Sequence, residues 1–288
     1  MSADRPASLP PFRPMPATVR VGTVDVVPLA ENALVHQVEQ SWHRGEGGWI
    51  VTANVDIVRA AARDRALSAL VAEADIVVAD GMPVVWAARI AGKDVPERVT
   101  GSSLVYSLTE AAARTGKSVF LLGGEPGVPE TAAEALRAKY DGLQVAGTHS
   151  PPFGFEKDEA SLASVVRLVE EAKPDLVLVG LGFPKQERVI QRLRAVLPDS
   201  WYVGVGAGIP MAAGEFTRAP VVVQRMGAEW LHRLALEPQR LARRYLLEDA
   251  PFALRLLAGA ARNRMTLSHR KDGRVVISPK PEIVNENV

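Results

Sequence analysis

The sequence predicts an α/β protein whose parallel sheet is covered by helices on both faces. Six short runs rich in β-branched residues are predicted to be strands, and runs that are apolar throughout are typical of strands buried on both sides. Segments rich in Ala, Leu, Glu and Arg separate these runs and have helical periodicity. Strand–helix alternation favours right-handed crossovers, and therefore a Rossmann-like sheet. Near residue 218 the strands stop, and a C-terminal helical basic appendage is expected to follow.

The predicted elements follow one another in a simple order. A proline-rich segment, residues 1–20, is interpreted as a loosely attached, disordered arm. The α/β domain is predicted to cover 21–217, the appendage 218–265 and a flexible tail 266–288. The expected strands are 49–54, 75–80, 118–124, 143–149, 175–182 and 201–207. Pro238 and Pro251 are expected to break the appendage into two or three helices.

Composition excludes several classes of protein. A net charge of +1 argues against a dedicated nucleic-acid binder, which usually carries a strong basic excess. The chain has no cysteine, which rules out disulfides and thiolate chemistry. The N-terminus lacks the apolar core of a signal peptide, and no run approaches the ~20 apolar residues that span a bilayer. We therefore expect a cytoplasmic protein, with attachment to a membrane surface still possible.

Polar side chains end two consecutive predicted strands. Thr52 and Asn54 end the first, and Asp80 ends the second, directly before Gly81. Ligands of open parallel sheets bind beyond the carboxyl ends of the strands, and neighbouring strands lie roughly 5 Å apart. One site facing all three polar side chains is therefore a reasonable hypothesis. The alternative is that Asn54 and the Asp80–Gly81 pair simply cap helices.

Two glycine-rich turns follow strands, at 121–127 and 203–210, and contain Gly124 and Gly206. Glycines allow the backbone to approach phosphates, and helix N-termini favour anions. Neither turn is a complete dinucleotide fingerprint, because Ile209 stands where the third glycine belongs. Glycine turns alone are weak evidence, since most are tight loops.

The segment 181–190, LGFPKQERVI, is more distinctive. It places Pro184, Lys185 and Gln186 at the predicted start of a helix. Proline suits this position, but lysine opposes the helix dipole unless an anion is nearby. This unusual placement favours a functional role for Lys185.

Metal and cofactor sites are not expected. The histidines are scattered without ligand spacing, at 36, 43, 149, 232 and 269. The chain has no Asp-x-Asp, the usual device for holding a divalent ion on a nucleotide diphosphate, and no Gly-x-Ser-x-Gly elbow. The sequence therefore predicts chemistry without a metal or a bound cofactor.

The predicted appendage is strongly basic. Between Arg218 and Arg270 there are ten arginines and four acidic residues, a local excess of six positive charges. An apolar stripe is possible beside them, formed by Trp230, Leu231, Leu234, Leu241 and Tyr245. A basic amphipathic surface suits an anionic bilayer. The alternative is that these residues pack on the domain or on another subunit.

Seven motifs together resemble one known family. In order they are TANVDIV, ADGMPVVWAARIAG, ERVTGSSL, VFLLGG, PPFGF, VGLGFPKQE and GVGAGI. From about Val21 to Leu247 the chain resembles the WecG/TagA/CpsF family, glycosyltransferase family 26. The resemblance implies transfer of a sugar from a UDP-sugar to a polyprenyl-diphosphate-linked saccharide, with inversion and without a metal. It leaves the donor open between N-acetylmannosamine, its uronic acid, glucose and others.

The resemblance also implies roles for individual residues. Asp80 matches the catalytic base, and Thr52 an active-site residue that orients substrate. Arg98 and Gln186 match positions that contact substrate. In the appendage, Arg233, Arg240 and Arg243 match arginines that would bind the departing diphosphate. Asn54, Lys185, Gly124 and Gly206 are expected to bind substrate on the same motifs.

Two other classes of function remain open from the residues. The fold and the glycine turns are compatible with a nucleotide-dependent oxidoreductase, and a non-catalytic membrane scaffold would keep the fold without the chemistry. The favoured reading has a UDP-sugar, a polyprenyl-linked acceptor and the inner face of the cytoplasmic membrane as partners. A homo-oligomer is possible, and no nucleic-acid partner is expected.

Overall fold

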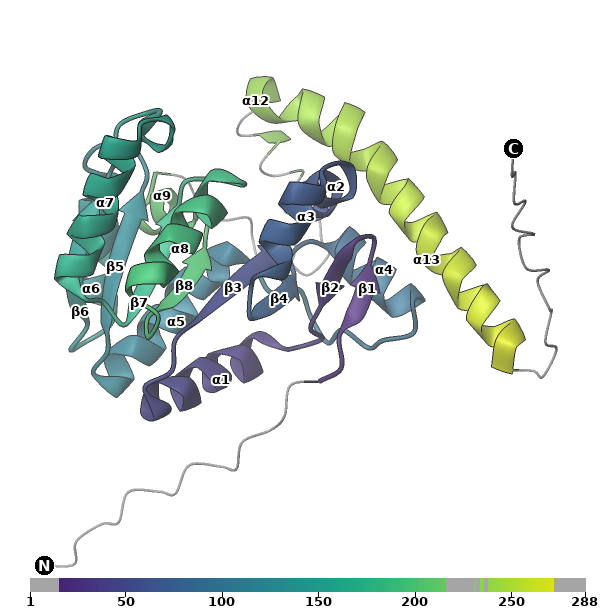
Figure 1. The fold of residues 1–288 in the computed structure, drawn as a ribbon, viewed down its shortest axis with the longest axis horizontal. Coiled ribbons are helices and arrows are strands. Elements are labelled where there is room, and N and C mark those ends of the chain that lie inside the picture. The colour runs from purple at the N-terminus through teal and green to yellow at the C-terminus, as the bar shows by residue number, and fades with distance from the viewer. Residues whose placement is uncertain (1–15, 216–230, 232–233, 236–237, 272–288) are drawn as a thin grey trace, which may run out of the picture.

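The computed structural model describes residues 16–215, 231, 234–235 and 238–271 (Figure 1). A parallel sheet of six strands in the order β4-β3-β8-β7-β5-β6 forms the centre of the molecule. Its strands are β3 (Gly48–Ala53), β4 (Ile76–Ala79), β5 (Ser118–Gly123), β6 (Gln144–His149), β7 (Leu176–Gly180) and β8 (Trp201–Gly204). All six predicted strands are present, and the predicted fold class is confirmed.

Helices cover both faces of this sheet. One face carries α1 (Glu31–Arg44), α5 (Gly101–Thr115), α6 (Val128–Lys139) and α9 (Gly208–Ala212). The other carries α2 (Val55–Arg63), α3 (Arg65–Ala72), α4 (Met82–Ile90), the 3-10 turn η1 (Phe155–Lys157), α7 (Glu159–Ala172) and α8 (Lys185–Val196). Side chains alternate along a strand, so Ile50 and Val51 enter opposite halves of the core. This two-sided burial explains why the strands are apolar throughout.

A short antiparallel hairpin precedes the sheet and is absent from the sequence prediction. It consists of β1 (Val19–Val21) and β2 (Val24–Val26), with Gly22 at φ +62° in the turn. The folded part therefore begins at Val19, inside the range 1–20 that the sequence analysis assigned to the arm. Valines alternate with exposed residues in VRVGTVDV, and this alternation is the signal that identifies the hairpin. Residues 1–15 lie outside the described part.

The C-terminal helices form one continuous path rather than separate segments. The path contains α12 (Pro238–Ala242), a π-helical turn η2 (Arg243–Asp249) and α13 (Ala250–Lys271). Figure 1 shows this run lying beside α2 and α4. Pro238 begins a helix, but the expected break at Pro251 is wrong. Pro251 directly follows the π-helical turn, and Ala250 before it keeps helical angles, so the path changes from π to α geometry there without ending.

The appendage also differs from its expected limits. The helix α13 continues to Lys271, six residues beyond the expected boundary at 265. Its side chains Phe252, Leu256 and Leu257 pack against the core beneath α2 and α4. This part of the appendage is therefore attached to the domain. Of the predicted apolar stripe, Trp230 and the Leu241 side chain lie outside the described residues, and Leu231 is half exposed.

Candidate active site

The topological switch point of the sheet lies between β3 and β8. These strands are neighbours, with Trp49 opposite Tyr202 in parallel register. The chain leaves β3 into α2 on one face of the sheet and leaves β8 into α9 on the other face. Because the two loops diverge, a ligand site is expected at the carboxyl edge between them.

The ends of β3 and β4 carry the predicted polar residues to this edge. Ala53 is opposite Ala79 in the parallel register, and the N–H of Asp80 donates to the Ala53 carbonyl at 3.0 Å. Asp80 and Asn54 therefore leave the sheet side by side, while Thr52 is buried within β3. The structure brings together the three residues that the sequence placed at adjacent strand ends.

A third segment places Arg98 on the far side of β4. The N–H of Val99 donates to the Ala79 carbonyl at 2.9 Å, which holds residues 98–100 along the end of that strand. Thr100 then caps α5 by accepting from the N–H of Ser103 at 3.0 Å. Arg98 immediately precedes Val99, and Asp80 immediately follows Ala79. The backbone thus sets a cationic and an acidic residue beside each other at the carboxyl edge.

Asn54 and Asp80 differ in whether they occupy the N-cap position of a helix. The Asn54 side chain accepts from the N–H of Ile57 at 3.0 Å and caps α2. Asn54 therefore performs the structural task that the alternative reading proposed. The N-cap of α4 is Gly81, at φ +102°, so Asp80 does not occupy the capping position. Asp80 therefore lies between the end of β4 and the N-cap residue of α4.

Gln186, at the start of α8, joins the loops that follow β7 and β8. Its Oε1 accepts from the N–H groups of Gly182 at 3.1 Å and Gly206 at 3.3 Å, and the side chain is buried. Its Nε2 donates to Glu187 Oε1 at 2.9 Å. The N–H of Gly206, expected to approach a phosphate, is therefore used within the protein. A Cβ at Gly206 would meet open space.

Glu187 is a buried acid that sequence reasoning did not select. Its side chain is 1% exposed, and burial raises its pKa to about 7. Its Oε2 has no hydrogen-bond partner among the described residues. An acid in the first turn of a helix normally indicates compensation of the helix dipole at the surface, so no local signal predicts this burial.

Two predicted binding residues lie elsewhere along the edge. Lys185 Nζ is 3.4 Å from Glu156 Oε1 and 5.2 Å from the centroid of the exposed Phe153 ring. The anion that its position called for is thus supplied by Glu156 of the same chain. Gly124 follows β5, four strand positions from β4, a separation of roughly 19 Å at the usual spacing. Gly124 is therefore not beside Asp80.

The predicted arginines of the appendage are only partly described. Arg233 lies outside the described residues, and so does the side chain of Arg240, whose backbone belongs to α12. Arg243 is exposed at the start of η2. The π turn itself contacts α2, the helix that begins directly after Asn54. The π turn of the appendage is therefore anchored near the carboxyl edge.

An ion-pair cluster provides this anchor. Arg59 on α2 contacts Asp56 Oδ1 and Glu248 Oε2 at 2.5 Å each. Arg244 of η2 reaches back to Asp56 Oδ2 at 3.1 Å. Burial, followed by the charge of Asp56, raises the pKa of Asp249 in the same cluster. Opposite charges from two segments distant in sequence thus hold η2 on α2.

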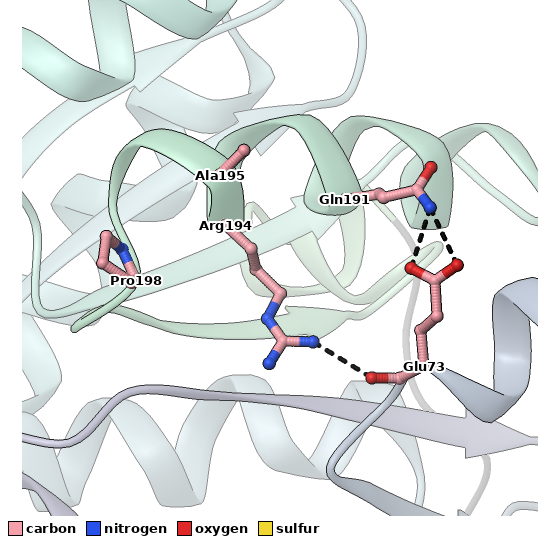
Figure 2. A pocket seen from close by; sticks show the side chains of 5 residues that line it. All are labelled: Glu73, Gln191, Arg194, Ala195 and Pro198. Carbon is pink, nitrogen blue, oxygen red and sulfur yellow. Dashed lines mark hydrogen bonds between the residues drawn. The ribbon is translucent and has the colours of Figure 1, made fainter.

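A cavity of about 300 Å³ lies at the other end of the sheet, and Figure 2 shows five side chains that line it. Gln191 Nε2 donates to both carboxylate oxygens of Glu73, and Arg194 donates to the Glu73 carbonyl at 3.0 Å. Glu73 precedes β4, and Pro198, which also lines the cavity, precedes β8, so this is the amino edge. The cavity is therefore separate from the residues around Asp80. Within the described part of the chain, no group of three acidic or histidine side chains is placed to hold a metal ion.

A parallel α/β sheet with polar residues at its switch point defines a class of proteins that bind ligands at the carboxyl edge of the strands. Residues 19–266 match the Glycosyl transferase WecG/TagA/CpsF family, and the chain belongs to this family. The match extends beyond both ends of the resemblance noted from the motifs. It also leaves the oxidoreductase alternative without support.

Curated relatives share most of their length with this chain. A Bacillus spizizenii protein named N-acetylglucosaminyldiphosphoundecaprenol N-acetyl-beta-D-mannosaminyltransferase is 30% identical over 227 residues, 78% of this chain and 86% of the relative. Proteins of the same name from two Staphylococcus aureus strains, MRSA252 and NCTC 8325, are 33% and 32% identical over 214 residues, in each case 74% of this chain and 81% of the relative. None of the helices described here has the length and apolar character that a bilayer span requires.

Proposed function

We propose that this protein transfers a sugar from a UDP-sugar to a polyprenyl-diphosphate-linked saccharide, with inversion and without a metal ion. The product would serve the synthesis of a cell-surface polysaccharide. The names of the relatives favour an N-acetylmannosamine donor and an acceptor ending in N-acetylglucosamine. The observation that carries the proposal is the placement of Asp80 beside Asn54 and Arg98 at the switch point of the sheet.

The proposed step is a single displacement at the anomeric carbon of the donor. The acceptor hydroxyl oxygen forms the new bond to this carbon as the bond to the β-phosphate oxygen breaks. The Asp80 carboxylate takes the hydroxyl proton, which increases the nucleophilicity of the acceptor oxygen. UDP leaves with the electron pair of the broken bond, and the configuration inverts because attack and departure occur on opposite faces. Thr52, at the end of β3, would orient the substrate.

The departing UDP carries negative charge that needs stabilisation. Arginine suits a diphosphate because its planar donors form paired hydrogen bonds. Arg98 is placed at the edge by the Val99 contact with β4, and Arg243 begins the π turn that is anchored to α2. We assign leaving-group stabilisation to these arginines together with Arg233 and Arg240.

The appendage would also bring the enzyme to its acceptor. Leu247 and Leu254, on η2 and α13, are 71% and 69% exposed, and Arg243, Arg255 and Arg262 are exposed on the same helical run. Apolar side chains flanked by arginines suit the interface of an anionic bilayer. A polyprenyl-linked acceptor resides in such a membrane. We therefore place the protein at the inner face of the cytoplasmic membrane.

A donor screen tests the transfer. The protein is incubated with a panel of UDP-sugars and a short-chain polyprenyl-diphosphate N-acetylglucosamine acceptor, with chelator present, and UDP release is followed. Acceptor-dependent release with one donor is expected. Release that requires added divalent metal would contradict the metal-free mechanism. Silence across the panel, combined with no UDP binding by calorimetry, would favour the scaffold alternative.

A further inference from the structure

The amide of Gln186 is held in one of its two orientations. Its Oε1 faces two backbone donors, the N–H groups of Gly182 and Gly206, and its Nε2 faces the Glu187 carboxyl. A reversed amide would point its NH₂ group at two N–H donors and its oxygen at Glu187 Oε1. The Glu187 carboxyl and the two backbone N–H groups therefore favour the same orientation, and Glu187 is the only one of these contacts that acts on the Nε2 side of the amide.

The burial of Glu187 is difficult to explain by stability alone. Burying a carboxyl group is costly, and an apolar side chain of similar size would avoid the cost. The Glu187 side chain is 1% exposed, and its Oε2 lacks a partner among the described residues. A partly satisfied buried acid of this kind is characteristic of functional sites.

The last residue of β8 leaves space for the side chains of Gln186 and Glu187. A Cβ added to Gly204 would lie 2.3 Å from Gln186 Nε2 and 3.1 Å from Glu187 Oε1. Gly204 is the last residue of β8, two positions before Gly206. Only a residue without a side chain leaves room for the pair beneath the loop that borders the crevice.

We propose that Glu187 is a positioning residue of the transfer site. By accepting from Gln186 Nε2, it fixes Gln186 Oε1 on the N–H groups of Gly182 and Gly206, and so holds together the loops that follow β7 and β8. The β8 loop borders the crevice that β3 lines with Thr52 and Asn54. The effect on catalysis rests on the proposed function, whereas the effect on the two loops does not.

The test compares Glu187→Met, which removes the acceptor, with Glu187→Gln, which keeps an acceptor oxygen in the same shape. Ile190→Val is the matched control, because Ile190 is buried on the same helix and its hydrocarbon side chain offers the Gln186 amide no hydrogen bond. Hydrogen exchange at Gly182 and Gly206 is measured by NMR, and kcat and KM are measured with the active donor. Glu187→Met is expected to exchange faster at both glycines and to lose about 10- to 100-fold in kcat, with a smaller change in KM.

Rescue and coupling complete the test. Glu187→Gln is expected to recover at least tenfold in kcat over Glu187→Met, and Ile190→Val to leave the exchange at both glycines unchanged. In a Gln186→Leu background, Glu187→Met should cause little further loss, because its action passes through Gln186. This double variant removes both side chains of the Gln186–Glu187 hydrogen bond, so neither is left unpaired, and it is compared with Gln186→Leu alone because both lack the acceptor for the N–H groups of Gly182 and Gly206.

Two results would overturn the proposal. One is unchanged exchange at both glycines in Glu187→Met, and the other is an equal loss of kcat in Ile190→Val. If the wild-type protein transfers no sugar, the proposed function fails, and the exchange measurements still decide whether Glu187 positions the loops.

Discussion

The Arg59 guanidinium on α2 lies 2.5 Å from the Glu248 carboxylate on η2, a contact between residues 189 positions apart in the chain. The Arg59 side chain is only 10% exposed, so solvent screens this contact weakly. The contact ties the C-terminal helical run to the helix that begins at the carboxyl edge. Loss of this tie should therefore affect the appendage before it affects the sheet.

Arg59→Met is expected to destabilise the docked appendage by about 1–3 kcal/mol, because Glu248 loses this ion pair while Asp56 and Asp249 keep only Arg244 among the described residues. Hydrogen exchange across 250–262 should accelerate more than exchange across β3. The control is Arg114→Met, which removes an exposed pair with Glu39 and should cost about 1 kcal/mol or less. Equal protection of α13 in the Arg59 variant and the wild type would contradict this role.

Asp80→Asn is expected to fold normally and to lose on the order of 10²- to 10⁴-fold in kcat, because the amide cannot take the acceptor proton. Circular dichroism and thermal unfolding check the fold, and UDP release measures turnover. Binding of UDP should change little, since the variant keeps the shape of the side chain. Full turnover in the variant would exclude Asp80 as the base.

Two substitutions at Asn54 separate its role as a helix cap from its proposed role in substrate binding. Asn54→Ala should lower the free energy of unfolding by about 1 kcal/mol through loss of the α2 cap, whereas Asn54→Ser retains a capping oxygen. If Asn54 also binds substrate, as we propose, Asn54→Ser should keep its stability and still raise KM. A serine variant with wild-type stability and wild-type KM would leave Asn54 with the capping role alone.

Glu187 should make stability depend on pH. Burial raises its pKa from 4.5 to about 7, so the folded protein holds this proton more tightly than the unfolded chain does. The corresponding stabilisation is complete below about pH 4.5 and is lost as the pH rises through about 7, a change on the order of 3 kcal/mol.

Urea unfolding at pH 5 and pH 8 measures this effect. The wild-type protein should lose more stability over this interval than Glu187→Gln, in which position 187 does not titrate. Parallel losses in the two proteins would show that Glu187 titrates near its ordinary pKa.

The exposed leucines of the appendage should control membrane binding. Leu247→Glu combined with Leu254→Glu is expected to reduce flotation with vesicles that contain anionic phospholipid, with turnover on a water-soluble acceptor largely kept. Leu168→Glu, on α7, is the control, since Leu168 is exposed on a helix that contacts β6, at the opposite edge of the sheet from β4. Undiminished flotation of the double variant would place the membrane contact on another surface.

Much of the fold was accessible from local pattern. Apolar, β-branched runs identify the sheet strands, although the edge strand β6 is only partly buried, and carboxyl ends of adjacent parallel strands place Asn54 next to Asp80. The hairpin is absent from the prediction because each of its strands has only three residues, and its alternating pattern follows directly on the proline-rich segment. The expected break at Pro251 is wrong because the π-helical turn before it lets the helical path continue, and no local pattern predicts that turn.

The sequence by itself determined the class of fold, the family and the edge of the sheet where Asp80, Thr52 and Asn54 gather. Tertiary structure decided the partners: Glu156 for Lys185, Glu187 for Gln186, and Glu248 for Arg59. The periodicity of apolar residues along the sequence predicts which face of a helix or strand is buried. This pattern involves only residues that are close together in the chain. Pairing between polar side chains depends on how distant segments meet, so burial of an acid such as Glu187 appears only once the chain is folded.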